Sequence, residues 1–437
     1  MFVRPLVSRT ILACLGEGNR LRIGIALMAT VFPSTLVAQR DSTFVAWARS
    51  RATPLESAAN PMPFRALDPV VRDARIIGVG ESVHEIHQFL ELRFGLLRDL
   101  VERQRVTAVA LESGLPEGMD LDAYVTGRSD SIDFTTAIDY GFGRFEEVRQ
   151  AFRWLREWNL GRGRRRPVRV YGVDLPGSAG SFVPALDRLA VVIGSNAPEA
   201  RAVIDELRPL ATRVVGGYWR PSAARYDSLS VSEKDSIRTG ARRLVAAVGR
   251  ARIEDGERAA WATRLAAVVA QAEQFLRVGA LDSTNPRDSA MVDNTRWVLE
   301  RVAPGDKLLL WAHNAHVQRA PIEGPPVPRG RTRNMGSMLS RLLGREYVAI
   351  GTAYGGPSVD SSTAPLAGSV DQVLGEVGPA RYLLPLGSAG APEAVARWLA
   401  QSRPIRFQVS HLLVPLGGAF DAIVYFDRAT PAVPVSP

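Results

Sequence analysis

The sequence predicts an α/β protein: a largely parallel sheet flanked by helices, with a helical subdomain inserted between two of its strands. From Arg75 onward, short runs rich in apolar and β-branched residues alternate with longer stretches of helical periodicity. Most of the short runs are apolar throughout, as expected for strands that helices cover on both faces of a sheet. Between Ser181 and Val302 the strand signal disappears. These three observations define the predicted fold class.

Seven runs are predicted to form the strands of this sheet. Each is short and rich in apolar or β-branched residues, and turn residues or helical stretches separate it from the next. The runs are Arg75–Val79, Thr107–Leu111, Val168–Val173, Lys307–Trp311, Tyr347–Thr352, Arg381–Leu386 and Asp421–Phe426.

The predicted insertion covers residues 181–285 and leaves an α/β core made of residues 39–180 and 286–428. Within it, Ser232–Val248 and Glu257–Val278 carry apolar residues at helical spacing, together with many alanines and arginines. Two further segments show no such periodicity. Pro321–Arg333 contains four prolines and two glycines and is predicted to be a loop, and residues 429–437 are predicted to form a flexible tail.

Residues 1–38 have the features of a secretory signal peptide. Four arginines precede an apolar run over residues 23–37, which ends at the small residue Ala38. A retained membrane anchor is the alternative, but Pro33 and a length of about fifteen residues disfavour a spanning helix. We therefore expect a periplasmic or secreted protein that has no membrane association once the signal is cleaved.

Charge and cysteine content exclude several classes of function. The formal charge is +9, but Lys234 and Lys307 are the only lysines, and the arginines are spread along the chain rather than clustered as a nucleic-acid footprint would be. We expect no nucleic-acid partner. Cys14 is the only cysteine and lies in the predicted signal. A mature chain without cysteine has no disulfides, thiolate nucleophile or zinc–sulfur site.

Unusual polar residues follow four of the predicted strands. They are Glu81 and His84 after the first, Glu112 after the second, Asp174 after the third, and His313, Asn314 and His316 after the fourth. The carboxyl ends of parallel strands share one edge of a sheet, and ligands bind in the crevice there. Four of the five histidines in the chain belong to these groups when His87 is included. The sequence therefore predicts one cleft lined by imidazoles and carboxylates.

Structural interpretations exist for some of these residues. Ser82-x-x-Glu85 fits a capping box at a helix start, and Glu81 could stabilise the amino terminus of the same helix. Asp174 could cap a turn, and His411 is expected to be a core or surface histidine. The histidine pairs spaced three apart would also lie on one face of a helix without any chemical role.

The strand-end motifs resemble the conserved blocks of the erythromycin esterase family over roughly residues 65–428. The blocks are Gly-Glu-Ser-Val-His at 80–84, Ala-Leu-Glu at 110–112, Tyr-Gly-Val-Asp at 171–174, Arg-Asp-x-x-Met-x-x-Asn at 287–294 and Ala-His-Asn-Ala-His at 312–316. The resemblance implies that active-site positions are occupied by Glu81, His84, Arg93, Glu112, His313 and His316. His84 would be the general base. This chain departs from the family pattern at Glu85, where a small residue is common, and over residues 86–88.

These residues suggest a hydrolytic mechanism without a cofactor. Neutral His84 would remove a proton from a water that attacks an ester or lactone carbonyl, while Glu81 or Glu112 orients the imidazole. His313 or His316 would stabilise the oxyanion or protonate the leaving alcohol. Contacts to the substrate are assigned to Arg93, Asp174, Asn314 and His87. A covalent serine mechanism is disfavoured because the chain has no Gly-x-Ser-x-Gly motif.

Two other functions remain open at this stage. The residues His84, His313, His316 and Glu112 could instead bind a divalent metal whose coordinated water is the nucleophile. Alternatively, the cleft could hold a ligand without turnover, because a fold does not by itself establish a reaction. The sequence names neither the natural substrate nor the oligomeric state.

Overall fold

The structure is a computed structural model that describes residues 34–435, apart from 57–61, 162–165, 280–284, 325–331, 357–364 and 409. The chain forms two compact units, Met1–Gln39 and Arg40–Pro437, and the description below concerns the second. Helix α1 (Ser34–Arg51) contains the last residues of the predicted signal, and the rest of that signal lies outside the described residues. None of the helices described is both long and apolar enough to cross a membrane.

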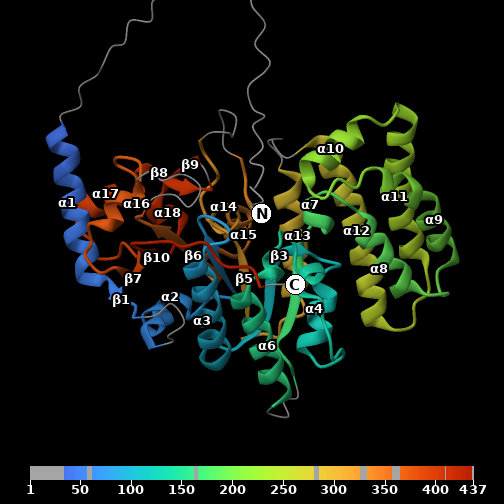
Figure 1. The fold of residues 1–437 in the computed structure, drawn as a ribbon, viewed down its shortest axis with the longest axis horizontal. Helices are drawn as coiled ribbons and strands as arrows, with labels where there is room; N and C mark the ends of the chain where they lie inside the picture. The colour runs from blue at the N-terminus through green and yellow to red at the C-terminus, as the bar shows by residue number, and fades with distance from the viewer. Residues whose placement is uncertain are drawn as a thin grey trace, which may run out of the picture. The chain divides into compact units, whose positions relative to one another are not determined.

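An eight-stranded, mostly parallel sheet forms the centre of the unit (Figure 1). Its strands, in spatial order, are β1 (Thr53–Pro54), β7 (Arg381–Pro385), β10 (Ala422–Phe426), β6 (Tyr347–Tyr354), β2 (Ile76–Glu81), β5 (Lys307–His313), β3 (Val106–Gly114) and β4 (Arg169–Asp174). From β10 to β4 all neighbours are parallel, whereas β7 pairs antiparallel with both β1 and β10. The predicted fold class is confirmed, and each of the seven predicted runs overlaps a strand of this sheet.

Side chains alternate between the two faces of the sheet and join two separate buried clusters. In β5, Leu308 and Leu310 belong to one cluster, and Leu309 and Trp311 to the other. Helices α3 (His87–Arg103) and α6 (Glu146–Leu160) supply most helical residues of the second cluster.

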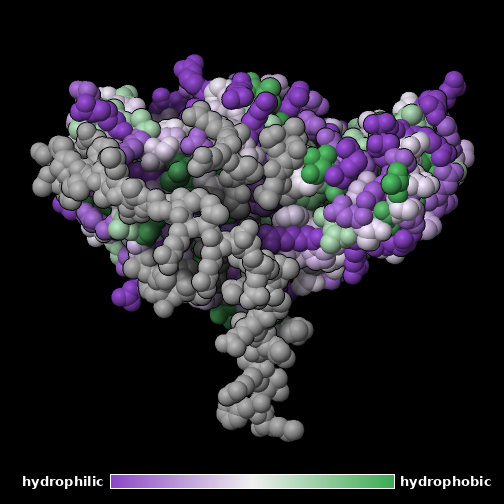
Figure 2. Space-filling view, turned by 90° about the horizontal axis from the view of Figure 1, so that it is seen from above, coloured by the Kyte–Doolittle hydropathy of each residue, from purple (hydrophilic) through white to green (hydrophobic). Residues whose placement is uncertain are grey.

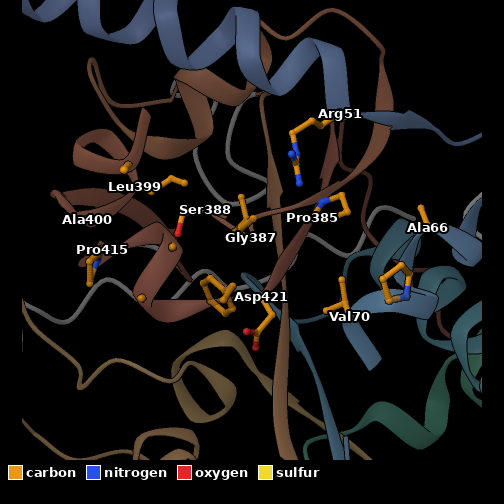
Figure 3. A pocket seen from close by; sticks show the side chains of 16 residues that line it. Arg51, Ala66, Val70, Pro385, Gly387, Ser388, Leu399, Ala400, Pro415 and Asp421 are labelled. Carbon is orange, nitrogen blue, oxygen red and sulfur yellow. The ribbon is translucent and has the colours of Figure 1, made fainter. Parts of the chain in front are cut away.

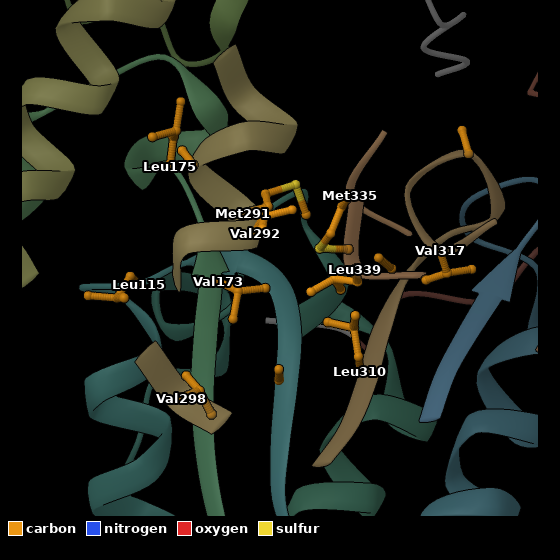
Figure 4. Close-up of a cluster of buried hydrophobic side chains, with 14 of the residues drawn as sticks. Leu115, Val173, Leu175, Met291, Val292, Val298, Leu310, Val317, Met335 and Leu339 are labelled. Carbon is orange, nitrogen blue, oxygen red and sulfur yellow. The ribbon is translucent and has the colours of Figure 1, made fainter. Parts of the chain in front are cut away.

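On the opposite face, two of the helices that contribute to the first cluster are α13 (Pro286–Leu299) and α15 (Met335–Leu343). Figure 4 shows Met291 of α13 and Met335 of α15 lying above Val173 of β4 and Leu310 of β5. Helices therefore cover both faces, which explains why the strand sequences are apolar without a break.

After β4 and α7 in the chain, the helices that precede α13 gather beside the sheet, at the right of Figure 1. They are α8 (Val183–Ile193), α9 (Pro198–Arg213), α10 (Trp219–Asp227), α11 (Val231–Arg250) and α12 (Gly256–Val278), preceded by the single turn α7 (Pro176–Ala179). Ser230 and Glu233 form a capping box that starts α11. The face of this group seen in Figure 2 is mostly hydrophilic, while its inner residues, such as Leu186 and Leu265, join the buried cluster that contains Leu310. The helical insertion is therefore continuous with the core of the sheet.

Shorter elements connect these layers. They are η1 (Met62–Leu67), α2 (Asp68–Val71), α4 (Gly118–Val125), α5 (Phe134–Ala137), η2 (Phe142–Arg144), α14 (Asn314–Val317), η3 (Gly344–Glu346), α16 (Val370–Gly375), α17 (Glu393–Ala400) and α18 (Leu416–Ala419). The antiparallel hairpin of β8 (Ser402–Phe407) and β9 (Ser410–Pro415) was not predicted from the sequence. Residues of this hairpin form part of the wall of a pocket.

Two local expectations differ from the structure. Helix α3 begins at His87 with Ile86 as its N-cap, so Ser82 and Glu85 do not form the expected capping box; Glu85 has a φ of 63° and pairs with Arg144. The expected flexible tail is paired along residues 430–435: the amide of Ala432 donates to the Glu85 carbonyl, and that of Val435 donates to the Arg144 carbonyl. These main-chain bonds hold the segment against the start of α3. Residues 436 and 437 lie outside the described range.

Candidate active site

The carboxyl ends of β2, β5 and β3 lie side by side and bring the predicted polar residues together. Glu81, the last residue of β2, is directly opposite His313, the last residue of β5. Glu112 of β3 accepts a hydrogen bond from the His313 amide at 2.7 Å. Residues more than 200 positions apart in the sequence therefore meet at one edge of the sheet.

His84 and Glu81 form a hydrogen-bonded pair at the centre of the site. Nδ1 of His84 lies 2.6 Å from Oε1 of Glu81, whose side chain is 1% exposed, whereas the His84 side chain is 28% exposed. The His84 ring packs edge-on against His313, with ring centroids 5.0 Å apart, and against Phe142. Because the carboxylate accepts a hydrogen bond from Nδ1–H, Nε2 is left as the basic nitrogen, and it has no partner among the described residues.

His313 is held neutral chiefly by burial, and two backbone bonds fix its tautomer. Its Nε2 lies 2.9 Å from the carbonyl oxygen of Ser82, and its Nδ1 accepts from the amide of Ala315 at 3.1 Å. These partners assign the proton to Nε2. Burial, followed by the nearby His84, lowers the pKa of His313 well below its usual value. Both ring nitrogens are therefore committed to the backbone.

Arg287 is the hub of a second, denser network. It follows Pro286 at the start of α13, where the Asn285 side chain caps the helix by accepting from the Asp288 amide. Its Nη2 donates to Oε1 of Glu112 and to the hydroxyl of Tyr140, each at 2.8 Å, and its Nε lies 3.1 Å from Oδ1 of Asp174. The guanidinium thus bonds two carboxylates and a phenol that come from three separate chain segments.

His316 completes this network as a charged imidazolium. Its Nδ1 lies 2.8 Å from Oδ1 of Asp288 and its Nε2 lies 3.3 Å from Oε1 of Glu112. Burial and the Arg287 guanidinium, whose Nη1 is 3.1 Å from Nε2, oppose the charged form. Asp288 and Glu112 outweigh both and raise the pKa of His316 to about 10. Burial would raise the pKa of Glu112, but His316 and Arg287 hold it well below its ordinary value.

A pocket of about 440 Å³ opens above these residues. Its polar end contains His84, Glu112, His313 and His316, joined by Tyr140, Arg287 and Asp288. Its remaining wall is largely aromatic and aliphatic, and comes from the helical insertion, the β8–β9 hairpin and the described ends of the predicted loop. The apolar residues of that wall are Tyr218, Trp219, Phe275, Ile322, Phe407 and Leu412. Residues 325–331 of the loop lie outside the described part of the chain.

Four of the five predicted catalytic residues line this pocket, and Glu81 lies directly behind His84. None of the four predicted substrate-binding residues lines it. Arg93 points inward: its Nη2 donates to the Ala312 carbonyl at 2.8 Å and its Nη1 lies 3.4 Å from Oε2 of Glu81. His87 pairs with Glu147 of α6 instead.

The other two predicted contacts are buried in the scaffold. Asp174 is fully buried beneath Arg287. Asn314 reaches across β2 to β6, where its amide donates to the Thr352 carbonyl at 2.8 Å and its Oδ1 accepts from the Thr352 amide at 3.2 Å. A Cβ at Gly80 would lie 2.2 Å from this Oδ1, which explains a glycine at that position of β2. In this arrangement Asn314 fastens strands rather than substrate.

Sequence reasoning assigned no role to Arg287, Asp288 or Tyr140. The Arg-Asp pair was visible as a block after Pro286, but its position over the sheet edge depends on how α13 packs. Tyr140 lies in a turn with a φ of 58°, and the neighbouring sequence does not predict this backbone conformation. Only the tertiary structure brings its hydroxyl to Asp174, at 3.1 Å.

Over the part of the chain that the structure describes, no three His, Cys, Asp or Glu side chains are arranged to hold a metal ion. A second cavity, of about 810 Å³, lies near the ends of β7 and β10 and beside α17 and α18 (Figure 3). Its charged lining residues are Arg51 and Asp421, and Asp421 is already bonded to Arg319. None of the predicted site residues contributes to it.

Comparisons with known proteins agree with the strand-end motifs. The family model described as erythromycin esterase matches residues 101–429, which is most of the chain. Erythromycin esterase type II of Escherichia coli is 25% identical over 84% of this chain and 92% of its own length. Among solved structures, a Bacillus cereus protein aligns over 91% of this chain and 99% of its own, with a TM-score of 0.75 at 21% identity. A mutant of the erythromycin esterase EreC in its open conformation aligns over 89% of this chain and 99% of its own, with a TM-score of 0.71 at 22% identity. The chain belongs to the erythromycin esterase family of hydrolases.

Proposed function

We propose that this protein hydrolyses a carboxylic ester or lactone of a small molecule, with His84 as the general base. The observation that carries the proposal is the His84–Glu81 pair: a buried carboxylate 2.6 Å from Nδ1 fixes the tautomer and leaves Nε2 directed for proton transfer. His84 lines the pocket, so a substrate carbonyl and a water can both reach that nitrogen. The same carboxylate stabilises the imidazolium that forms, as the buried aspartate does in serine hydrolases.

The reaction follows from this geometry. Nε2 of His84 takes a proton from water while the water oxygen attacks the carbonyl carbon, which gives a tetrahedral oxyanion. Arg287 and His316 both line the pocket and both carry positive charge, so they are placed to stabilise that oxyanion. As the intermediate collapses, the bond to the leaving oxygen breaks and the proton on Nε2 passes to the departing alcohol.

The apolar wall indicates the kind of substrate. Trp219 and Phe275 come from the helical insertion and Phe407 from the hairpin, so flat or aliphatic surfaces face the polar end of the pocket. A substrate with an apolar ring or chain next to its ester would bury that part against these side chains. We propose an uncharged ester or lactone of this class.

In residues 1–38, arginines come first, an apolar run follows, and the run ends at a small residue. This order supports a periplasmic or secreted location for the mature protein. Fractionating a host that expresses the full chain, next to one that expresses a chain without residues 2–38, tests this location. We expect only the full chain to be exported. Equal cytoplasmic retention of both would contradict it.

Purified protein tested against a panel of lactones and aryl esters, with and without a chelator, tests the proposed reaction. We expect hydrolysis of at least one apolar ester, unchanged after chelation. Loss of activity on chelation, restored by a divalent metal, would support the metal-dependent mechanism with the same histidines. Tight binding of a ligand without hydrolysis across the panel would contradict the enzymatic proposal.

A further inference from the structure

Residues 430–435 form a strap across the turn that joins β2 to α3. The amide of His87 donates to the Thr430 carbonyl at 2.9 Å, and the amide of Ala432 donates to the Glu85 carbonyl at 2.8 Å. These two bonds flank an antiparallel β-bridge. The main chain of the turn is therefore tied to the strap at two points.

Two side-chain bonds fix the register of the strap. Nε2 of Gln88 donates to Oγ1 of Thr430, and Oε1 of Gln88 accepts from the Thr430 amide, both at 2.9 Å. Gln88 is buried in the first turn of α3. Because one amide side chain uses both of its groups on Thr430, a strap shifted by one residue would lose both bonds.

The far end of the strap holds the segment whose ring supports His84. The Val435 amide donates to the Arg144 carbonyl at 2.8 Å, and the Arg144 side chain pairs with Glu85. Phe142 lies two residues before Arg144 and packs edge-on against the His84 ring, with ring centroids 5.4 Å apart. The strap thus joins the turn that carries His84 to the segment that packs against it.

Glu85, which directly follows His84, has an unfavourable backbone conformation. Its φ of 63° lies in the left-handed region, which residues other than glycine seldom adopt. Such a conformation persists where surrounding bonds hold it. Here the Ala432 amide holds the Glu85 carbonyl, and Arg144 holds the Glu85 side chain. A change in this φ would turn the chain that carries His84 relative to α3.

The position of His84 has little tolerance for such a change. Its Nδ1 lies 2.6 Å from Oε1 of Glu81, which is the last residue of β2. A misplacement of about 1 Å can cost roughly 10²-fold in rate, even when its cause lies far from the chemistry. None of residues 430–435 lines the substrate pocket. The strap therefore acts on the reaction only through the groups that it holds.

We propose that Thr430 and Ala432 are positioning residues for the general base: they hold Glu85 in its left-handed conformation and thereby keep His84 on Glu81. This inference rests on the proposed esterase function, in which His84 is the base. It also gives a role to a segment whose sequence predicts a flexible tail.

Ala432→Pro tests the main-chain bond, because proline has no amide hydrogen to donate. The matched control is Val433→Pro, which adds a proline at an exposed residue whose amide has no main-chain partner in the described structure. We expect kcat of Ala432→Pro to fall roughly tenfold, less than on removal of the base itself and in line with the cost of a left-handed residue. KM stays near the wild-type value, and Val433→Pro keeps both constants.

A second substitution, at Glu85, separates positioning from general folding. Glycine adopts a positive φ without steric cost, so Glu85→Gly combined with Ala432→Pro should recover kcat to within about threefold of Glu85→Gly alone. Glu85→Ala removes the same carboxylate but keeps a Cβ, and with Ala432→Pro it should stay roughly tenfold below Glu85→Ala alone. Equal recovery by both substitutions, or recovery by neither, would overturn the proposal.

If Ala432→Pro does not fold, Thr430→Val supplies the test. This change removes the hydroxyl that accepts from Gln88, and we expect a roughly threefold lower kcat from the lost hydrogen bond. Thr430→Ser keeps the hydroxyl and should keep the wild-type kcat. Equal kcat values for the two variants at position 430 would contradict the positioning role.

Proton NMR of nitrogen-15-labelled protein gives a readout that needs no substrate. The proton between Nδ1 of His84 and Glu81 should give a slowly exchanging resonance in the wild type and in Val433→Pro, and should lose it in Ala432→Pro. Its persistence in Ala432→Pro would show that the strap does not hold His84. If the wild type hydrolyses no ester while the resonance disappears in Ala432→Pro, the proposed function fails and the positioning role stands.

Discussion

The two histidine-bearing sides of the candidate site differ in how many of their bonds are already made. On one side, His84 has a single carboxylate partner, Glu81, and its side chain lines the pocket. On the other, His316 is enclosed by Asp288, Glu112 and Arg287, and the last of these also bonds Asp174 and Tyr140.

This difference separates proton transfer from electrostatic support. A nitrogen that is to exchange a proton with substrate must be free in the resting enzyme, and His84 meets that condition. A fixed charge that is to stabilise an oxyanion is better held by many partners, because it then needs no reorganisation during the reaction. The sparse side, formed by His84 and Glu81, is therefore suited to proton transfer. The dense side, which is the network around His316 and Arg287, is suited to holding a fixed charge and the shape of the site.

Removing His84 should have the largest effect on activity. We expect His84→Ala to lower kcat by about 10²–10⁴-fold, the usual contribution of a general base. Its melting temperature should stay close to that of the wild type, because His84 lies in a partly exposed turn. Steady-state kinetics and thermal melts check both. His411→Gln, outside the pocket, serves as the control, and near-normal turnover of His84→Ala would remove the assignment.

Glu112→Gln should instead lower the free energy of unfolding, because it disrupts the dense side. Glu112 bonds Arg287, His316 and the His313 amide, so its loss leaves buried cations without their partner. Breaking a buried pair in this way costs about 3–5 kcal/mol of unfolding free energy. Urea denaturation measures it, with the surface variant Asp235→Asn as the control, for which a change below about 1 kcal/mol is expected. Equal stabilities would show that the network is not structural.

Trp219→Ala tests whether the apolar wall selects the substrate. The change removes a large ring from the pocket but touches neither histidine side. Losing about 1.4 kcal/mol of apolar burial raises KM about tenfold for a bulky ester. We expect kcat for that ester, and both constants for a small acetate ester, to stay near wild type. A uniform loss on both esters would assign Trp219 to folding.

The dense side also predicts that stability depends on pH. The folded pKa of His316 is raised from 6.5 to about 10, so its contribution is complete below pH 6.5 and is lost as pH rises through about 10. Between these two pH values the unfolded state has lost the His316 proton and the folded state still holds it. The stability of the wild type relative to His316→Gln therefore falls by up to about 1.4 kcal/mol per pH unit. Denaturation curves at several pH values check the slope. A constant difference between the two proteins would contradict it.

Apolar patterning was enough to predict the strands of the sheet, but it missed the β8–β9 hairpin. Its first strand contains Arg403 and Arg406, which are buried against the rings of Trp398 and Tyr354. Arginines that stack on aromatic rings lie in the interior while reading as polar in the sequence. The alternation that identifies a half-buried strand was therefore hidden.

For the candidate site too, the sequence located some residues correctly and misplaced or missed others. Strand ends located Glu81, Glu112 and His313 because a parallel sheet fixes which termini share an edge. The direction in which a polar side chain points after the strand depends on packing, so Asn314 was expected at the substrate and instead bonds Thr352. Arg287 lies 113 residues from Asp174, and no local pattern reports that contact.

His313 at the end of β5 is held neutral and His316 just after it is held positively charged, which leaves His84 to exchange protons. Nitrogen-15 NMR of labelled protein, assigned with single histidine variants, reports the tautomer and charge of each ring directly. Between pH 6.5 and 8.5 we expect His313 to remain neutral with its proton on Nε2, and His316 to remain doubly protonated. A neutral His316 or a titrating His313 in that range would contradict the account.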